Sequence, residues 1–87
     1  MLEAVKLALR IASNVFDDEL SDLIAAAIAD LMLCGVQKVE ETDPLIKRAV
    51  VLYCKSNFGS DPNSEKYQRS YDLLKGSLQI AGDYNGV

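Results

Sequence analysis

The chain of 87 residues contains no histidine. This absence excludes histidine metal ligands and removes the side chain that most often serves as a general base near neutral pH. A cysteine or serine nucleophile would therefore need an unusual lysine-assisted scheme. The five glycines are scattered and form no phosphate-binding loop. We expect a protein that is not an enzyme, with no catalytic residue, no metal site and no cofactor.

Cysteine is scarce as well. Cys34 and Cys54 are the only two, and neither belongs to a pair with the spacing of metal ligands. Both fall within apolar helical segments, where a free cysteine behaves as a small apolar side chain. We interpret them as reduced core residues of a cytoplasmic protein rather than as a disulfide.

Long apolar segments and excess positive charge are also missing. No apolar segment approaches the roughly 18 residues of a membrane-spanning helix, and the charged residues Glu3, Lys6 and Arg10 argue against an N-terminal signal peptide. The net charge of −4 argues against a dedicated nucleic-acid-binding protein, which is normally basic. A helix–turn–helix is disfavoured too, since the connection over 36–42 is too long for its tight turn.

What is present is a hydrophobic content of 49%, which is typical of a folded chain. The length predicts one domain over residues 1–87. A domain of this size buries only about 60–65% of the surface of its unfolded chain. Its core is therefore small, and assembly with other chains would stabilise it.

Apolar residues recur every three or four positions along most of the chain, which is the period of a helix. Turn-forming residues interrupt this pattern at Ser13-Asn14, at Gly35 and over 57–64. The sequence thus predicts an all-α fold, a small bundle of four helices with short loops. The expected helices span residues 2–11, 17–34, 44–58 and 63–80.

The segment 17–35, DDELSDLIAAAIADLMLCG, is the expected organising element of the fold. Seven apolar residues lie on one face of this helix: Leu20, Leu23, Ile24, Ala27, Ile28, Leu31 and Met32. The opposite face is not polar, as it would be on a simple surface helix. It carries Ala25, Ala26, Ala29 and Leu33, with Asp22 beside them. A helix that is apolar on both sides needs two partners, and the second can be another copy of the chain.

The third expected helix is two-sided as well. Its main face is Leu45, Ala49, Leu52, Tyr53 and Ser56, and its other side is Val50, Val51, Cys54 and Phe58. The second faces of the two helices either cover each other within one domain or form contacts between subunits, and the sequence leaves both alternatives open. The candidate subunit interface is Ala25, Ala26, Ala29, Leu33, Val50, Val51 and Phe58.

Capping signals delimit the helices. Asp17 is expected to cap the second helix, with Phe16 packing on its first turn as a hydrophobic staple. Gly35 suits the left-handed position that follows a helix C-terminus. Asp43 is the expected cap of the third helix, because Pro44 fits the first helical position, where no N–H is needed.

The acids at the start of the second helix have two interpretations. Asp17, Asp18, Glu19 and Asp22 could bind a hard cation or serve a hydrolase. They also lie where the helix dipole favours negative charge. We favour the capping and dipole interpretation, since the spacing does not fit an EF-hand loop.

The fourth expected helix has one apolar stripe and one polar face. The stripe consists of Tyr67, Tyr71, Leu74, Leu78 and Ala81. The residues expected to face water are Lys66, Arg69, Asp72, Lys75 and Gln79. This alternation is typical of a helix that packs on one side only.

Four segments together carry a resemblance to a known family. They are LALRI, then DDEL followed by LIAAAIADL, then DPLIKRAVVLYCKSNFG, and finally YQRSYDLLKGSLQIAGDY. The combination of an acidic turn, an alanine-rich helix, an Asp-Pro helix start and a closing YxxxYxLLxxxL pattern resembles the small head–tail connector (adaptor, or head-completion) proteins of tailed bacteriophages. The matching features span nearly the whole chain.

The resemblance implies a structural role in the virion. Such proteins form a ring of about a dozen copies beneath the portal, at the DNA exit vertex of the capsid. One side of the ring meets the portal protein and the other meets a stopper or head-completion protein, while DNA passes through the channel as cargo. The expected location is the head–tail junction, after assembly in the host bacterial cytoplasm, with no membrane involved.

Under this resemblance, acidic residues would face the channel or a partner. The candidates are Asp17, Asp18, Glu19, Glu40 and Glu41. A negative channel wall repels DNA phosphates and lets the duplex slide. In the C-terminal segment 82–87, Tyr84 is the candidate anchor for contact with the portal. The alternative hypothesis is a small helical protein-binding or regulatory module without catalytic activity.

Overall fold

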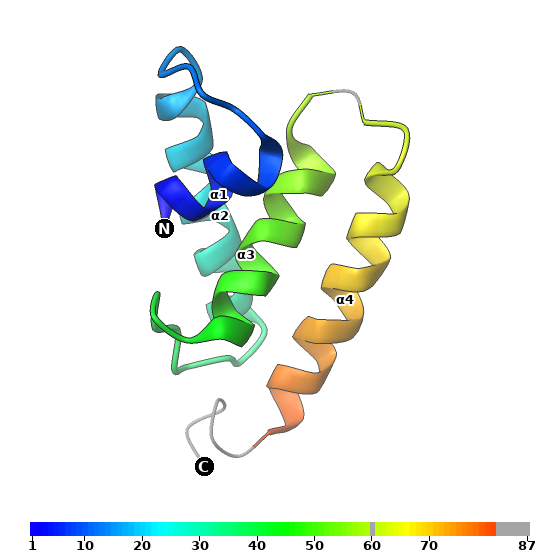
Figure 1. Cartoon of the computed structure of the whole chain (residues 1–87). Coiled ribbons are helices and arrows are strands. Elements are labelled where there is room, and N and C mark those ends of the chain that lie inside the picture. Colours follow the sequence, from blue (N-terminus) through cyan, green and yellow to red (C-terminus); the bar gives the residue numbers. More distant parts are fainter. Residues whose placement is uncertain (60, 82–87) are drawn as a thin grey trace.

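A computed structural model of the chain describes residues 1–59 and 61–81. Its elements are α1 (Leu2–Leu9), α2 (Asp17–Leu33), α3 (Pro44–Asn57) and α4 (Ser64–Ile80) (Figure 1). The predicted all-α bundle of four helices is confirmed, and every helix boundary lies within two residues of the expected one. Within the described ranges, no helix is long and apolar enough to cross a membrane.

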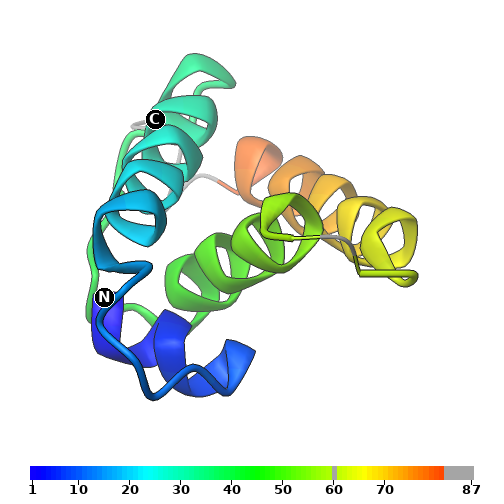
Figure 2. The same cartoon turned by 90° about the horizontal axis from the view of Figure 1, so that it is seen from above.

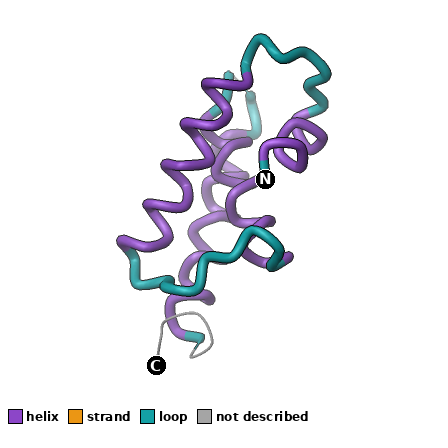
Figure 3. The backbone as a smooth tube through the Cα atoms, turned by 90° about the vertical axis from the view of Figure 1, so that its left-hand side faces the viewer, coloured by secondary structure: helices purple, strands orange, loops and turns teal. Residues whose placement is uncertain are grey.

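Helix α3 is the central element of the fold. It packs against α1, α2 and α4, and Figure 2 shows it between α2 and α4. Helices α2 and α4 both run antiparallel to α3 (Figure 1). The loops that join them to α3 lie at opposite ends of the bundle (Figure 3). Six of its residues are buried: Ile46, Ala49, Val50, Val51, Leu52 and Cys54. The expectation that α2 organises the fold is therefore wrong, because α3 rather than α2 is covered on more than one side.

The core draws on every helix. Helix α2 contributes four buried residues, Leu20, Ile24, Ala27 and Leu31, all of which belong to its predicted apolar face. Helix α4 contributes Tyr71 and Leu78, and Tyr67 and Leu74 pack against them while partly buried. The predicted inner faces of α2 and α4 are thus confirmed except at Met32, which is 57% exposed and lies on the outer side of α2. Both cysteines are free, and Cys54 is buried as expected.

Helix α1 ends at Leu9, two residues before its predicted end. Arg10 adopts a left-handed conformation with a φ of 59°. Its N–H donates to the carbonyl of Leu7, and the N–H of Ile11 donates to the carbonyl of Lys6 at 2.9 Å. These two bonds form a Schellman motif, in which glycine is the usual left-handed residue. The conformation costs other residues roughly 1–2 kcal/mol, and with no glycine at position 10 the apolar periodicity alone predicted a longer helix.

The prediction for α2 is confirmed at its C-terminal end and wrong at its N-cap. Gly35 has a φ of +95°, and the N–H of Val36 donates to the carbonyl of Leu31 at 3.0 Å, as expected for a glycine-terminated helix. At the start, Phe16 rather than Asp17 is the N-cap, and no side chain caps the helix. The ring of Phe16 packs edge-on against Phe58, with 5.3 Å between centroids. An aromatic partner just after the C-terminus of α3 therefore replaces the predicted staple.

Helix α3 begins as its sequence predicts. The carboxylate of Asp43 accepts a hydrogen bond from the N–H of Leu45 at 2.9 Å, and Pro44 occupies the first turn. This cap satisfies one of the amide groups that a helix N-terminus leaves without a partner.

Candidate assembly surface

The outer face of α2 is an uncovered surface with apolar and acidic parts. Because the helix buries its other side against α1 and α3, Ala25, Ala26 and Ala29 are exposed to solvent. Leu33 is 87% exposed and Met32 is 57% exposed, at the C-terminal end of the same face. Small side chains in the middle of this face permit another helix to approach closely.

The second part of the predicted interface is not at the surface. Val50 is fully buried and Val51 is 7% exposed, since α1, α2 and α4 surround α3. The expectation of an apolar strip for another subunit is therefore wrong for Val50, whereas the small exposed part of Val51 lines a groove between α1 and α3. Phe58 is half-buried against Phe16. Of the two alternatives left open by the sequence, internal packing holds for α3, while the alanine face of α2 is uncovered in the single chain.

The candidate channel acids do not form one cluster. Asp17 pairs with Lys6 at 2.8 Å, and Lys6 also donates to Asn14 at 2.7 Å. Lys6 is only 7% exposed, so this ion pair fastens the start of α2 to α1 and occupies Asp17. The other candidates, Asp18, Glu19, Glu40 and Glu41, are exposed. The first two lie at the start of α2 and the other two in the loop beyond its end, so they lie near opposite ends of that helix (Figure 1).

A shallow groove of about 300 Å³ opens between α1 and the first half of α3. Ala4, Ala8 and Val51 form its apolar part, and Pro44, Lys47 and Arg48 complete the lining. Leu7, which is 82% exposed, lies on α1 between the two alanines. Neither Lys47 nor Arg48 forms an ion pair with the residues of 1–59 and 61–81. The groove therefore combines a small-residue floor with two cations that have no ion-pair partner in the described part of the chain.

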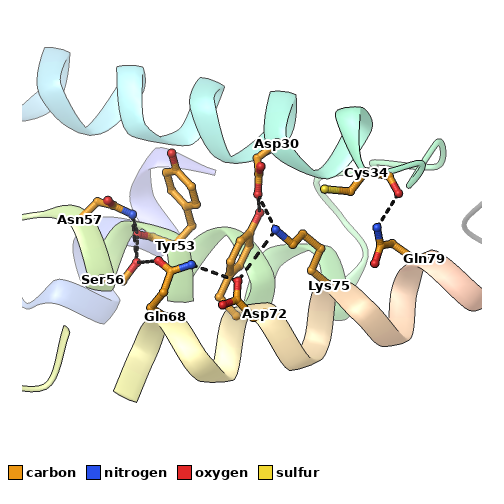
Figure 4. Close-up of polar contacts among 10 residues, drawn as sticks. Asp30, Cys34, Tyr53, Ser56, Asn57, Gln68, Asp72, Lys75 and Gln79 are labelled. Atoms are coloured by element: carbon orange, nitrogen blue, oxygen red, sulfur yellow. Dashed lines mark hydrogen bonds and ion pairs between the residues drawn. The ribbon is translucent and has the colours of Figure 1, made fainter. Parts of the chain in front are cut away.

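Polar side chains connect α2 to α4 (Figure 4). One carboxylate oxygen of Asp30 accepts hydrogen bonds from the hydroxyl of Tyr71 at 2.5 Å and from the ammonium of Lys75 at 3.2 Å. The ammonium of Lys75 also lies 5.0 Å from the centroid of the Tyr71 ring. These three residues form what we call the Asp30 clamp. Lys75 was expected to face water, and this expectation is wrong because Asp30 draws its side chain toward α2.

A second contact between the same helices lies nearer their C-terminal ends. The side-chain amide of Gln79 donates to the carbonyl of Cys34 at 2.8 Å, which satisfies a carbonyl left free where α2 ends. Two polar contacts, the Asp30 clamp and the bond from Gln79 to Cys34, thus connect α4 to α2. Hydrophobic packing against α3 alone does not fix the position of α4 relative to α2.

The sequence contained a signal for the clamp that the apolar pattern obscured. Asp30 is the one acid in the apolar half of its helix, between Ala29 and Leu31. Tyr71 and Lys75 are spaced by four residues, so they lie on the same side of α4. Two apolar residues on the outside of α4 were not predicted, Leu73 at 75% exposure and Ile80 at 83%.

The clamp shifts the pKa of each of its members. The hydrogen bond from Tyr71, aided by Lys75, lowers the pKa of Asp30 below its ordinary 3.8 even though burial opposes this. Burial is the main cause that raises the pKa of Tyr71 above its ordinary 10.0, and the bond to Asp30 adds to it. Burial by itself lowers the pKa of Lys75, but the hydrogen bond and charge of Asp30 offset this, so the pKa lies above 10.5.

These shifts predict a pH dependence of stability. A lowered carboxyl pKa stabilises the fold fully above pH 3.8, and this contribution is lost as the pH falls through the pKa of folded Asp30. A raised Tyr71 pKa stabilises the fold fully below pH 10.0, and this contribution is lost as the pH rises toward the pKa of the folded state, because only the unfolded chain ionises readily. Urea unfolding at several pH values measures both effects.

The control for the alkaline effect is Tyr71→Phe, which removes the ionisable hydroxyl. Above pH 10.0, the free energy of unfolding of the unmodified chain should fall more steeply with pH than that of the variant. Equal slopes for the two proteins would contradict the assignment to Tyr71.

Two further predictions concern ligands and the C-terminus. Among residues 1–59 and 61–81, no group of three or more histidine, cysteine, aspartate or glutamate side chains could hold a metal ion. Tyr84, the candidate portal anchor, lies outside the described residues.

Comparison with known protein families identifies the family of this chain. The model of a family described as "Phage connector protein" matches residues 1–85, all but the last two residues of the chain. No match was found among curated proteins or among solved structures. The match covers the acidic turn, the alanine-rich helix and the closing tyrosine–leucine pattern that carried the resemblance.

Proposed function

Because this chain belongs to the phage connector protein family, we propose that it forms a ring that joins the portal to the stopper or tail proteins. The family gives a structural role in the virion. The ring, its portal and stopper partners, its part in head completion and the passage of DNA through its centre are the proposal. A ring of about a dozen copies is the form that the resemblance implies.

The observation that carries this proposal is the uncovered outer face of α2. A chain of this size has little interior, yet it leaves three alanines, Met32 and Leu33 at the surface of one helix. Apolar faces of this kind mark contacts with other proteins.

The exposed acids suit a channel or a partner-facing rim. Asp18, Glu19, Glu40 and Glu41 are free of ion pairs with the described residues. A ring that turns some of them toward its centre would present negative charge to DNA, which weakens non-specific binding of the phosphates. Asp17 is the weakest of the candidates, because Lys6 neutralises it.

Native mass spectrometry tests the assembly. We expect the purified chain to form a closed oligomer at high protein concentration or when it is mixed with the portal protein of its phage. A strict monomer under both conditions would contradict the ring and favour the small protein-binding module. Filter binding to duplex DNA at several salt concentrations is the companion measurement, and we expect no steep dependence on salt.

A further inference from the structure

We infer that the groove between α1 and α3 is the receptor for the outer face of α2 of a second copy of the chain. This inference rests on the proposed ring and specifies its subunit contact. The groove is the surface lined by Ala4, Ala8, Pro44, Lys47, Arg48 and Val51.

Charge identifies the occupant. Lys47 and Arg48 have no acidic partner within residues 1–59 and 61–81. Helix α2 contains five acids and no lysine or arginine, and its exposed Asp18 and Asp22 are likewise without ion-pair partners in the described part of the chain. A basic groove rim and an acidic helix face are complementary, which favours this pairing over one between two acidic faces.

The apolar parts of the two surfaces also fit each other. Ala25 and Ala29 are one helical turn apart on α2, and Ala4 and Ala8 are one turn apart on α1. Small residues on both sides let two helices approach to the lower end of the usual distance of roughly 8–10 Å. Asp22 lies one turn before Ala25 on the same side of the helix, so one contact can unite the alanines and place the acid at the basic rim.

The positions of the two surfaces determine the kind of assembly. The outer face of α2 points away from the core, whereas the groove is lined by residues of α1 and α3 alone, so the two are different surfaces of the molecule. A contact between two different surfaces is heterologous and repeats from copy to copy, and it gives the proposed ring when the rotation between copies closes. A contact of the α2 face with itself would stop at a dimer.

Charge reversal tests the pairing in the full-length chain. We expect Asp22→Lys alone and Arg48→Glu alone each to weaken assembly at least about tenfold, because each places like charges opposite one another. An equimolar mixture of the two variants should assemble again, since the lysine face of one then meets the glutamate groove of the other and the remaining pair keeps its original charges. Native mass spectrometry reports the composition of the mixed oligomer.

Matched controls are Glu65→Lys and Lys66→Glu, which reverse exposed charges on α4 and should leave assembly unchanged. Thermal unfolding establishes that all four variants fold. If the unmodified chain assembles but Arg48→Glu assembles equally well, or the mixture does not recover, the groove contact is overturned while the ring stands. If the unmodified chain assembles neither alone nor with the portal, the ring and the groove contact both fall.

Discussion

A Val50→Asp variant should lose at least about 3–5 kcal/mol of folding free energy, because the new carboxylate has no partner in the core. Val50 is fully buried at the centre of α3, where it contacts no solvent. The total stability of a domain of this length is on the order of 4–13 kcal/mol, at roughly 0.05–0.15 kcal/mol per residue. The substitution should therefore remove a large share of the stability, and urea unfolding followed by circular dichroism measures the loss.

The matched control is Val15→Asp, the same change at a side chain that is 80% exposed. Its effect on stability should stay within about 0.5 kcal/mol, as for most surface substitutions. Ala29→Glu provides the complementary comparison, since Ala29 is exposed on the outer face of α2. This variant should fold as a monomer and lose assembly. A folded Val50→Asp monomer that merely fails to assemble would move Val50 back to the interface.

Removing the central acceptor of the clamp should have the second-largest effect. We expect Asp30→Ala to cost about 1–3 kcal/mol, because it leaves the hydroxyl of the buried Tyr71 without a hydrogen-bond partner. Asp30→Asn keeps an acceptor oxygen and should cost less. Denaturant unfolding at neutral pH measures both variants, and the comparison separates the hydrogen bond from the charge.

Asp72→Ala is the control for this prediction. Asp72 lies 3.9 Å from the ammonium of Lys75, but its side chain is 55% exposed, so its ion pair with Lys75 contributes little. Equal losses for Asp30→Ala and Asp72→Ala would show that the clamp does not stabilise the fold.

The pairing of the groove with the α2 face connects these results to assembly. Helix α3 completes the core of the chain, because residues on both of its apolar sides are buried within the molecule. The second face of α2 has no such cover. The single chain thus has one uncovered helix face and one groove, which are the two surfaces that the proposed head-to-tail ring would join.

Local chemistry determined the helices of this protein. Three local features act on the backbone within a few residues: apolar residues at a period of three to four, an Asp-Pro start at 43–44, and Gly35 after α2. These features predicted four helices, the inner faces of α2 and α4, and the family, because each depends on neighbours in sequence. Where a local signal was missing, as at Arg10, the predicted boundary was wrong.

Only the tertiary structure decided which apolar face is covered. The sequence shows that α2 and α3 each have two apolar sides, but periodicity does not specify the partner of a face. Packing placed α3 at the centre, which buried Val50 and Val51 and left the alanines of α2 in solvent. The clamp was decided in the same way, since Asp30 and Tyr71 are 41 residues apart. Contacts between distant segments depend on how the helices pack, and that arrangement is not encoded in any one helix.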